Sequence, residues 1–133
     1  MIKKLTVGLL IIYVIIILCV TVLFRKPFEG QHFQPQLFWS YEVWEVQNKQ
    51  IIKNVLLFIP LGIIAGNLWK WKCILVGMGI SLLVELLQLI TARGLFEFDD
   101  IVHNTLGTLI GVSIYEFCVI LIRKRGFNNG VYN

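Results

Sequence analysis

The chain has 133 residues, of which 57% are hydrophobic and 15% are charged, and its mean hydropathy is +0.78. This composition excludes an ordinary soluble domain and indicates a membrane protein, and the length allows one domain, residues 1–133. The net charge of +4 does not indicate nucleic-acid binding, because the Lys and Arg residues lie at the edges of apolar runs.

Four apolar runs predict an all-α, integral membrane bundle of four transmembrane helices. In chain order they cover about 5–24, 51–69, 73–90 and 101–122. The first run has twenty residues without a charge, which at about 1.5 Å per residue is enough for about 30 Å of bilayer.

The segment between the first two runs, PFEGQHFQPQLFWSYEVWEVQNKQ, is too polar to cross a membrane and rich in aromatic residues. Such rings suit the headgroup layer, so we expect an interfacial anchor, with a lid over a site as the alternative. The aromatic residues concerned are Phe28, Phe33, Phe38, Trp39, Tyr41 and Trp44.

The distribution of basic residues predicts that both termini are cytoplasmic. With that orientation seven Lys and Arg residues lie inside: Lys3, Lys4, Lys70, Lys72, Arg123, Lys124 and Arg125. Five lie outside: Arg25, Lys26, Lys49, Lys53 and Arg93. The excess inside favours this orientation over the reverse.

Polar residues gather where the third run ends and where the second and fourth begin. In a four-span bundle these three points lie at the same, outer membrane face. Buried polar groups need partners or a ligand, so we expect a polar pocket there. Its candidate binding residues are Asn54, Glu85, Gln88, Arg93, Asp99, Asp100, His103 and Asn104.

Helical periodicity places these residues on facing stripes of the third and fourth runs. Glu85 and Gln88 share an arc with Ser81, and Asp100 and Asn104 share an arc with small residues deeper in the fourth helix. Those small residues, Gly107 and Gly111, have GxxxG spacing, which lets helices approach closely and also suggests a possible homodimer.

Glu85 is the most informative residue, because a carboxylate within an apolar span is costly. It is a structural ion-pair partner or, as we prefer, part of a functional site. Glu85 and Asp100 are the catalytic candidates if a reaction occurs, and Arg93 could bind a phosphate or carboxylate. One of Asp99 and Asp100 is expected to cap a helix.

No resident metal or cofactor is expected. Glu85, Asp100 and His103 form an oxygen-rich group that could hold a proton or a divalent ion. However, neither an HExxH nor a CxxC motif is present.

The order of motifs resembles the VanZ-like membrane protein family, which is named for a teicoplanin-resistance accessory protein. The motifs are NVLLFIPLG at 54–62, SLLVELLQ at 81–88 and DDIVHNTLGTLIG at 99–111. The resemblance covers about residues 50–115. Positions that match the family pattern are Asn54, Pro60, Gly62, Glu85, Gln88, Arg93, Asp100, Asn104, Gly107 and Gly111.

The resemblance implies a multi-spanning protein of the bacterial cytoplasmic membrane, some of whose relatives lower susceptibility to teicoplanin-type lipoglycopeptides. The preferred function is therefore binding or shielding, in which the outer pocket engages an envelope lipid or the drug and lowers its access. The first alternative is an integral-membrane enzyme acting on a lipid-linked substrate. The second is a small proton-coupled lipid transporter, which with four spans would need a homodimer.

Overall fold

The computed structural model describes residues 2–27 and 29–130, and it is 83% helical. Phe28, one of the predicted interfacial aromatic residues, lies outside the described residues. The elements in chain order are α1 (Ile2–Leu18), the π-helix η1 (Cys19–Leu23), β1 (Phe33–Gln34), α2 (Trp39–Glu42), α3 (Trp44–Trp69), the 3-10 helix η2 (Lys70–Lys72), α4 (Cys73–Thr91), β2 (Phe96–Glu97) and α5 (Phe98–Gly130).

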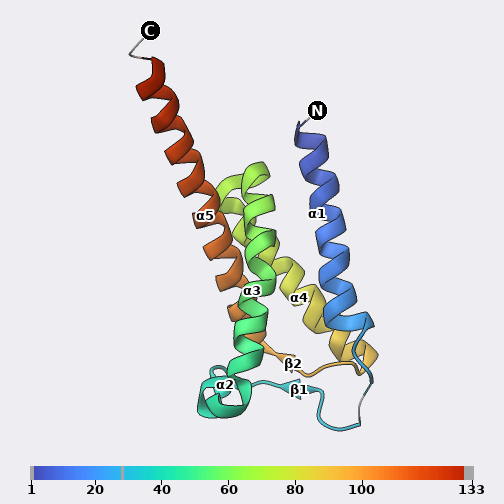
Figure 1. Cartoon of the computed structure of the whole chain (residues 1–133). Coiled ribbons are helices and arrows are strands. Elements are labelled where there is room, and N and C mark those ends of the chain that lie inside the picture. Colours follow the sequence, from blue (N-terminus) through green and yellow to red (C-terminus); the bar gives the residue numbers. More distant parts are fainter. Residues whose placement is uncertain (1, 28, 131–133) are drawn as a thin grey trace.

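Three helical stretches in the described part of the chain are long and apolar enough to cross a membrane. They are Lys3–Leu23, Trp44–Thr91 and Phe98–Arg125. The second stretch holds both α3 and α4, which η2 joins and which run in opposite directions (Figure 1). The predicted helical class is therefore confirmed, with three candidate stretches where the sequence predicted four runs.

The helices are longer than the apolar runs that predicted them. α3 begins at Trp44, seven residues before the second run, and α5 begins at Phe98 and continues to Gly130. Hydropathy marks only the part of a helix that is apolar, whereas backbone hydrogen bonding continues through polar residues such as Gln47 and Gln50.

Small residues bring α5 into backbone contact with α3. A Cβ at Gly107 would overlap the carbonyl oxygen of Val55, and one at Gly111 would overlap that of Ile59. These two glycines were predicted to face the third run or a second copy of the chain, but they lie against α3 of the same chain. The physical reason is that only glycine permits this approach of two helix backbones. Homodimerisation itself stays a prediction.

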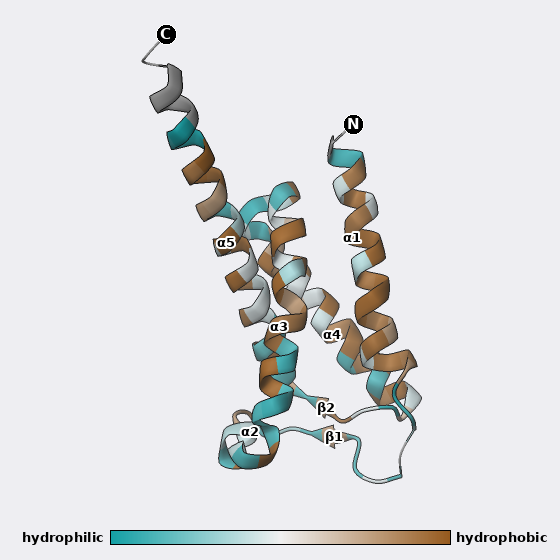
Figure 2. Ribbon diagram, viewed as in Figure 1, coloured by the Kyte–Doolittle hydropathy of each residue, from teal (hydrophilic) through white to brown (hydrophobic). Residues whose placement is uncertain are grey.

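The polar part of the molecule lies at one end of the helices. The beginning of α1 and the end of α5 lie at the opposite end from α2, β1 and β2 (Figure 1). β1 and β2 form a parallel pair in which Phe33 is opposite Phe96 and Gln34 is opposite Glu97. Figure 2 shows hydrophilic residues on α2 and the adjoining part of α3. We call α2, β1, β2 and the helix ends beside them the polar end.

Candidate functional site

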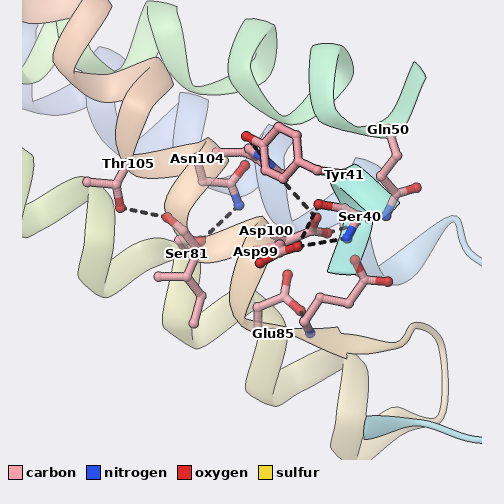
Figure 3. Close-up of polar contacts among 12 residues, drawn as sticks. Ser40, Tyr41, Gln50, Ser81, Glu85, Asp99, Asp100, Asn104 and Thr105 are labelled. Carbon is pink, nitrogen blue, oxygen red and sulfur yellow. Dashed lines mark hydrogen bonds and ion pairs between the residues drawn. The ribbon is translucent and has the colours of Figure 1, made fainter. Parts of the chain in front are cut away.

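Four buried carboxyl groups meet at the polar end, and we call them the carboxylate cluster. Glu85 lies on α4, Glu97 on β2, and Asp99 and Asp100 in the first turn of α5. None of the four residues is more than 3% exposed. The backbone N–H of Glu97 donates to Glu85 Oε2 at 3.0 Å, and Figure 3 shows the Glu85 side chain directed toward Asp99 and Asp100.

Asp99 holds the beginning of α2. Its carboxylate accepts hydrogen bonds from the backbone N–H groups of Phe38 at 2.5 Å and Ser40 at 3.0 Å, and from Ser40 Oγ at 2.5 Å. The sequence predicted that one of the two aspartates would cap the helix that they begin, and this stays a prediction. Asp99 accepts its hydrogen bonds from the beginning of α2, 61 positions away from it in the chain at Phe38.

Asp100 and His103 connect the cluster to α3 and to the aromatic segment. Gln50 Nε2 donates to Asp100 Oδ2 at 3.3 Å, and His103 Nδ1 lies 4.0 Å from Asp100 Oδ1. The other ring nitrogen, Nε2, is 2.9 Å from the Tyr41 hydroxyl. The segment before α3 is thus attached to the candidate site through both Asp99 and His103, as Figure 3 shows for Ser40 and Tyr41.

Glu97 lies between the membrane-spanning stretches and has an unusual protonation equilibrium. The pKa of Glu97 is raised to about 8, mainly by burial and then by the neighbouring Asp100 and Asp99 carboxylates, while Arg25 opposes the shift. At pH 7 the Glu97 carboxyl is therefore mainly neutral and able to donate a hydrogen bond. Its Oε2 is buried and has no partner among the described residues.

Gln88 and Arg93 contact the end of the first helix rather than the cluster. Gln88 Nε2 donates to the Thr21 carbonyl at 3.2 Å, and Arg93 Nη1 donates to the Leu23 carbonyl at 2.7 Å. These bonds fix the π-helical end of the first apolar run against α4 and the turn that follows it. Arg93 keeps its remaining guanidinium N–H groups for other partners.

The other two predicted residues lie apart from the carboxylate cluster. Asn104 Nδ2 donates to Ser81 Oγ at 2.8 Å, which joins α5 to α4 on the facing stripes that periodicity predicted (Figure 3). Asn54 is buried beside α1, and its Nδ2 has no hydrogen-bond partner among the described residues. The eight predicted residues therefore share the polar end without lining one common cavity.

Two cavities open beside the cluster. The first, of about 410 Å³, is the α1–α3 groove, lined by Tyr13, Val20, Thr21, Arg25, Lys53, Asn54, Leu56 and Leu57. The second, of about 400 Å³, is the cationic cavity, lined by Arg25, Lys26, Gln47, Gln50, Arg93, Gly94, Leu95 and Glu97. Arg25 belongs to both, so the two cavities adjoin.

Several residues of the site were not among the sequence candidates. Glu97 was not among the predicted binding residues, and Arg25 and Lys26 were used only to predict the orientation in the membrane. The charge count already placed Arg25, Lys26 and Arg93 at one membrane face, and this was the signal that could have identified them. No group of three His, Cys, Asp or Glu residues in the described part of the chain is arranged to hold a metal ion.

A nearly all-helical chain with long apolar helices and a polar end of this kind is a helical membrane protein. The VanZ/LLP1 family model matches residues 10–121, and the chain belongs to that family. It is also similar to Protein VanZ from Enterococcus faecium, with 34% identity over 74 residues. That match covers 50% of this chain and 44% of the relative, so the chain spans less than half the length of the relative it matches. No solved structure matches the chain.

Proposed function

We propose that this protein crosses the bacterial cytoplasmic membrane four times and binds an envelope lipid at an outward-facing polar end. By occupying or shielding that lipid, it lowers the binding of teicoplanin-type lipoglycopeptides to the cell surface. Family membership and the similarity to Protein VanZ support the link to glycopeptide resistance.

The lengths and directions of the helices support four crossings. α3 has 26 residues and α4 has 19, which at about 1.5 Å per residue correspond to about 39 and 28 Å. Each length is close to or above the thickness of the hydrocarbon core, about 30 Å. Their opposite directions, together with α1 and α5, leave the beginning and end of the chain on one side (Figure 1).

The aromatic segment supports placement of the polar end in the headgroup layer. Its rings Phe38, Tyr41 and Trp44 are between 48% and 58% exposed, although the segment is hydrogen bonded to the cluster. Exposed amphipathic rings beside apolar helix surfaces are typical of membrane interfaces.

The observation that carries the proposal is the junction of the α1–α3 groove with the cationic cavity at Arg25. One cavity is lined largely by apolar side chains and the other by cations and amides. A ligand with an apolar tail and an anionic head is complementary to such a pair, and envelope lipids have this chemistry.

Binding of a fluorescent teicoplanin-type drug to intact cells tests the proposal. Cells with wild type, Asp100→Asn or vector alone are compared at matched membrane levels, with growth inhibition measured on the same cultures. We expect wild type to lower drug binding and raise the inhibitory concentration, and Asp100→Asn to lose most of both effects. Equal drug binding in wild-type and vector cells would contradict the proposed function.

A second candidate function is an enzyme that acts on a lipid-linked substrate. The observation that favours it is that Glu97, neutral near pH 7, lines the same cavity as Arg93. A neutral carboxyl beside an anion-binding arginine could protonate a leaving group. This function predicts a change in the envelope lipid profile on deletion, which binding alone does not require.

A further inference from the structure

The cationic cavity contains three basic side chains without carboxylate partners. Arg25, Lys26 and Arg93 line it, and among the described residues none of them lies within 4.0 Å of a carboxylate oxygen. These three charges therefore have no close ion-pair partner in the described part of the chain, although Arg25 is near enough to Glu97 to lower its pKa. Arg93 is also held in place, because one of its N–H groups is bonded to the Leu23 carbonyl.

Glu97 and two amides complete the wall of the cavity. Glu97 is 3% exposed, and its Oε2 is an unpartnered buried oxygen. Gln47 and Gln50 add carboxamide groups, which can donate hydrogen bonds through their nitrogen atoms. An ionised Glu97 would repel an anion, whereas a neutral Glu97 can donate to one.

The α1–α3 groove shares Arg25 with this cavity and is otherwise lined mainly by helix residues, several of them apolar. Val20 comes from η1, while Leu56 and Leu57 come from α3, and all three line the groove. Tyr13 lies on the α1 side, with its hydroxyl bonded to the Leu57 carbonyl at 2.9 Å. A chain of methylene groups entering here would pass directly from Arg25 into apolar surroundings.

We propose that the cationic cavity binds the phosphodiester of an anionic phospholipid, one acyl chain of which occupies the α1–α3 groove. Arg25 lies at the junction and contacts the phosphate, Arg93 and Lys26 neutralise its charge, and Glu97 donates a hydrogen bond to a phosphate oxygen. This inference specifies the lipid class of the proposed function and rests on it only in placing the polar end beside lipid headgroups.

The combination of features favours a phospholipid over other anions. Inorganic phosphate would use the cationic cavity alone and leave the groove without a role. A fatty acid would use the groove, but it offers one carboxylate. The acceptor oxygens of one carboxylate are too few for the three cations and the other hydrogen-bond donors of the cavity. A zwitterionic phospholipid would bring a positive group into a cavity that is already positive.

The test uses the purified full chain in a non-ionic detergent and phosphatidylglycerol with a fluorescent acyl chain. Separate arms use phosphatidylcholine with the same chain, the matching fatty acid, and inorganic phosphate as a competitor. We expect tighter binding of phosphatidylglycerol than of either other lipid, and little competition from phosphate at millimolar concentration.

Variants assign the binding to the cavity. Arg25→Gln should weaken phosphatidylglycerol binding about five- to tenfold, as expected for losing one charge-assisted contact, and Arg25→Lys should restore part of it. Lys49→Gln is the matched control, because it removes the same charge from exposed α3 surface near the polar end. It should leave the affinity within about twofold.

The pH dependence of the affinity for phosphatidylglycerol tests the role of Glu97. A phosphodiester does not titrate between pH 6 and 9, so wild-type affinity should fall as Glu97 ionises near pH 8. The groups that face Glu97 are Glu85 from α4, Asp99 and Asp100 from α5, and Arg25, Lys26 and Arg93 around the cavity. Glu97→Gln should bind equally well at pH 6 and pH 9.

Equal affinity of wild type for phosphatidylglycerol and phosphatidylcholine would overturn the proposal, as would equal loss in Arg25→Gln and Lys49→Gln. The outcome is separable from that of the drug-binding experiment. Selective lipid binding in a protein that does not alter drug binding would refute the proposed function and leave this inference intact. Reduced drug binding without selective lipid binding would refute this inference and leave the proposed function intact.

Discussion

Asp99 and Glu97 are two acidic residues two positions apart, and their surroundings differ completely. Asp99 accepts three hydrogen bonds from Phe38 and Ser40. Glu97 is equally buried, but its Oε2 has no partner in the described part of the chain and its side chain lines a cavity with three cations. The first carboxylate joins parts of the protein, whereas the second has a side-chain contact with Asp100 and keeps one oxygen without a partner among the described residues, beside a cavity.

The comparison shows that burial alone does not identify a ligand-binding residue. Both residues are at most 3% exposed. The difference lies in how many donors the fold supplies to each carboxyl, since a carboxylate with several donors is stabilised in its charged form and one without them is not. A binding site is therefore to be sought where a buried polar atom lacks a partner and a cavity adjoins it.

Removing the Asp99 carboxylate should have the largest effect on stability. Asp99→Ala would leave three donors at the beginning of α2 without an acceptor, and we expect a loss on the order of 3 kcal/mol in the free energy of unfolding. The loss should appear as a lower Tm in thermal unfolding of the purified protein. Asp99→Asn, which keeps one acceptor oxygen, should lose less, and equal Tm values for Asp99→Ala and wild type would contradict the structural role.

Adding a methyl group at the α3–α5 contact should have the next largest effect. In Gly107→Ala the new Cβ would overlap the Val55 carbonyl oxygen and lie 2.9 Å from the Phe58 Cβ, so the helices must separate. We expect a loss of about 1–3 kcal/mol. Gly79→Ala is the control, because no atom lies within 4 Å of its Cβ position, and it should match or exceed wild-type Tm.

Ionisation of Glu97 should be visible in the pH dependence of stability. Its pKa is about 8 in the folded protein, compared with 4.5 for an unperturbed glutamate. Between these values the folded state holds a proton that the unfolded state has released, so stability falls as pH rises from 4.5 to 8. Glu97→Gln should show a shallower decline of Tm over this range, and an unchanged slope would refute the shifted equilibrium.

The sequence predicted the helical stripes correctly in part. Ser81 and Asn104 were placed on facing sides of the third and fourth runs, and they are hydrogen bonded at 2.8 Å. Gly107 and Gly111 were placed on the same stripe as Asn104, yet their contacts are with α3. A helix in a bundle has neighbours on more than one side, and periodicity gives the face of a residue without giving the identity of the neighbour.

The sequence by itself determined the apolar runs, the helical class and the gathering of polar residues at one end, because these depend on local composition and on periodicity along the chain. Only the tertiary structure decided which polar groups are satisfied. Asp99 meets Phe38 across 61 positions and Arg93 meets Leu23 across 70, so the partner of each buried group is set by helix packing far from it in sequence. Glu97 is a candidate residue for the same reason. Helix packing places hydrogen-bond donors beside its neighbour Asp99 and places Glu97 itself in the wall of a cavity.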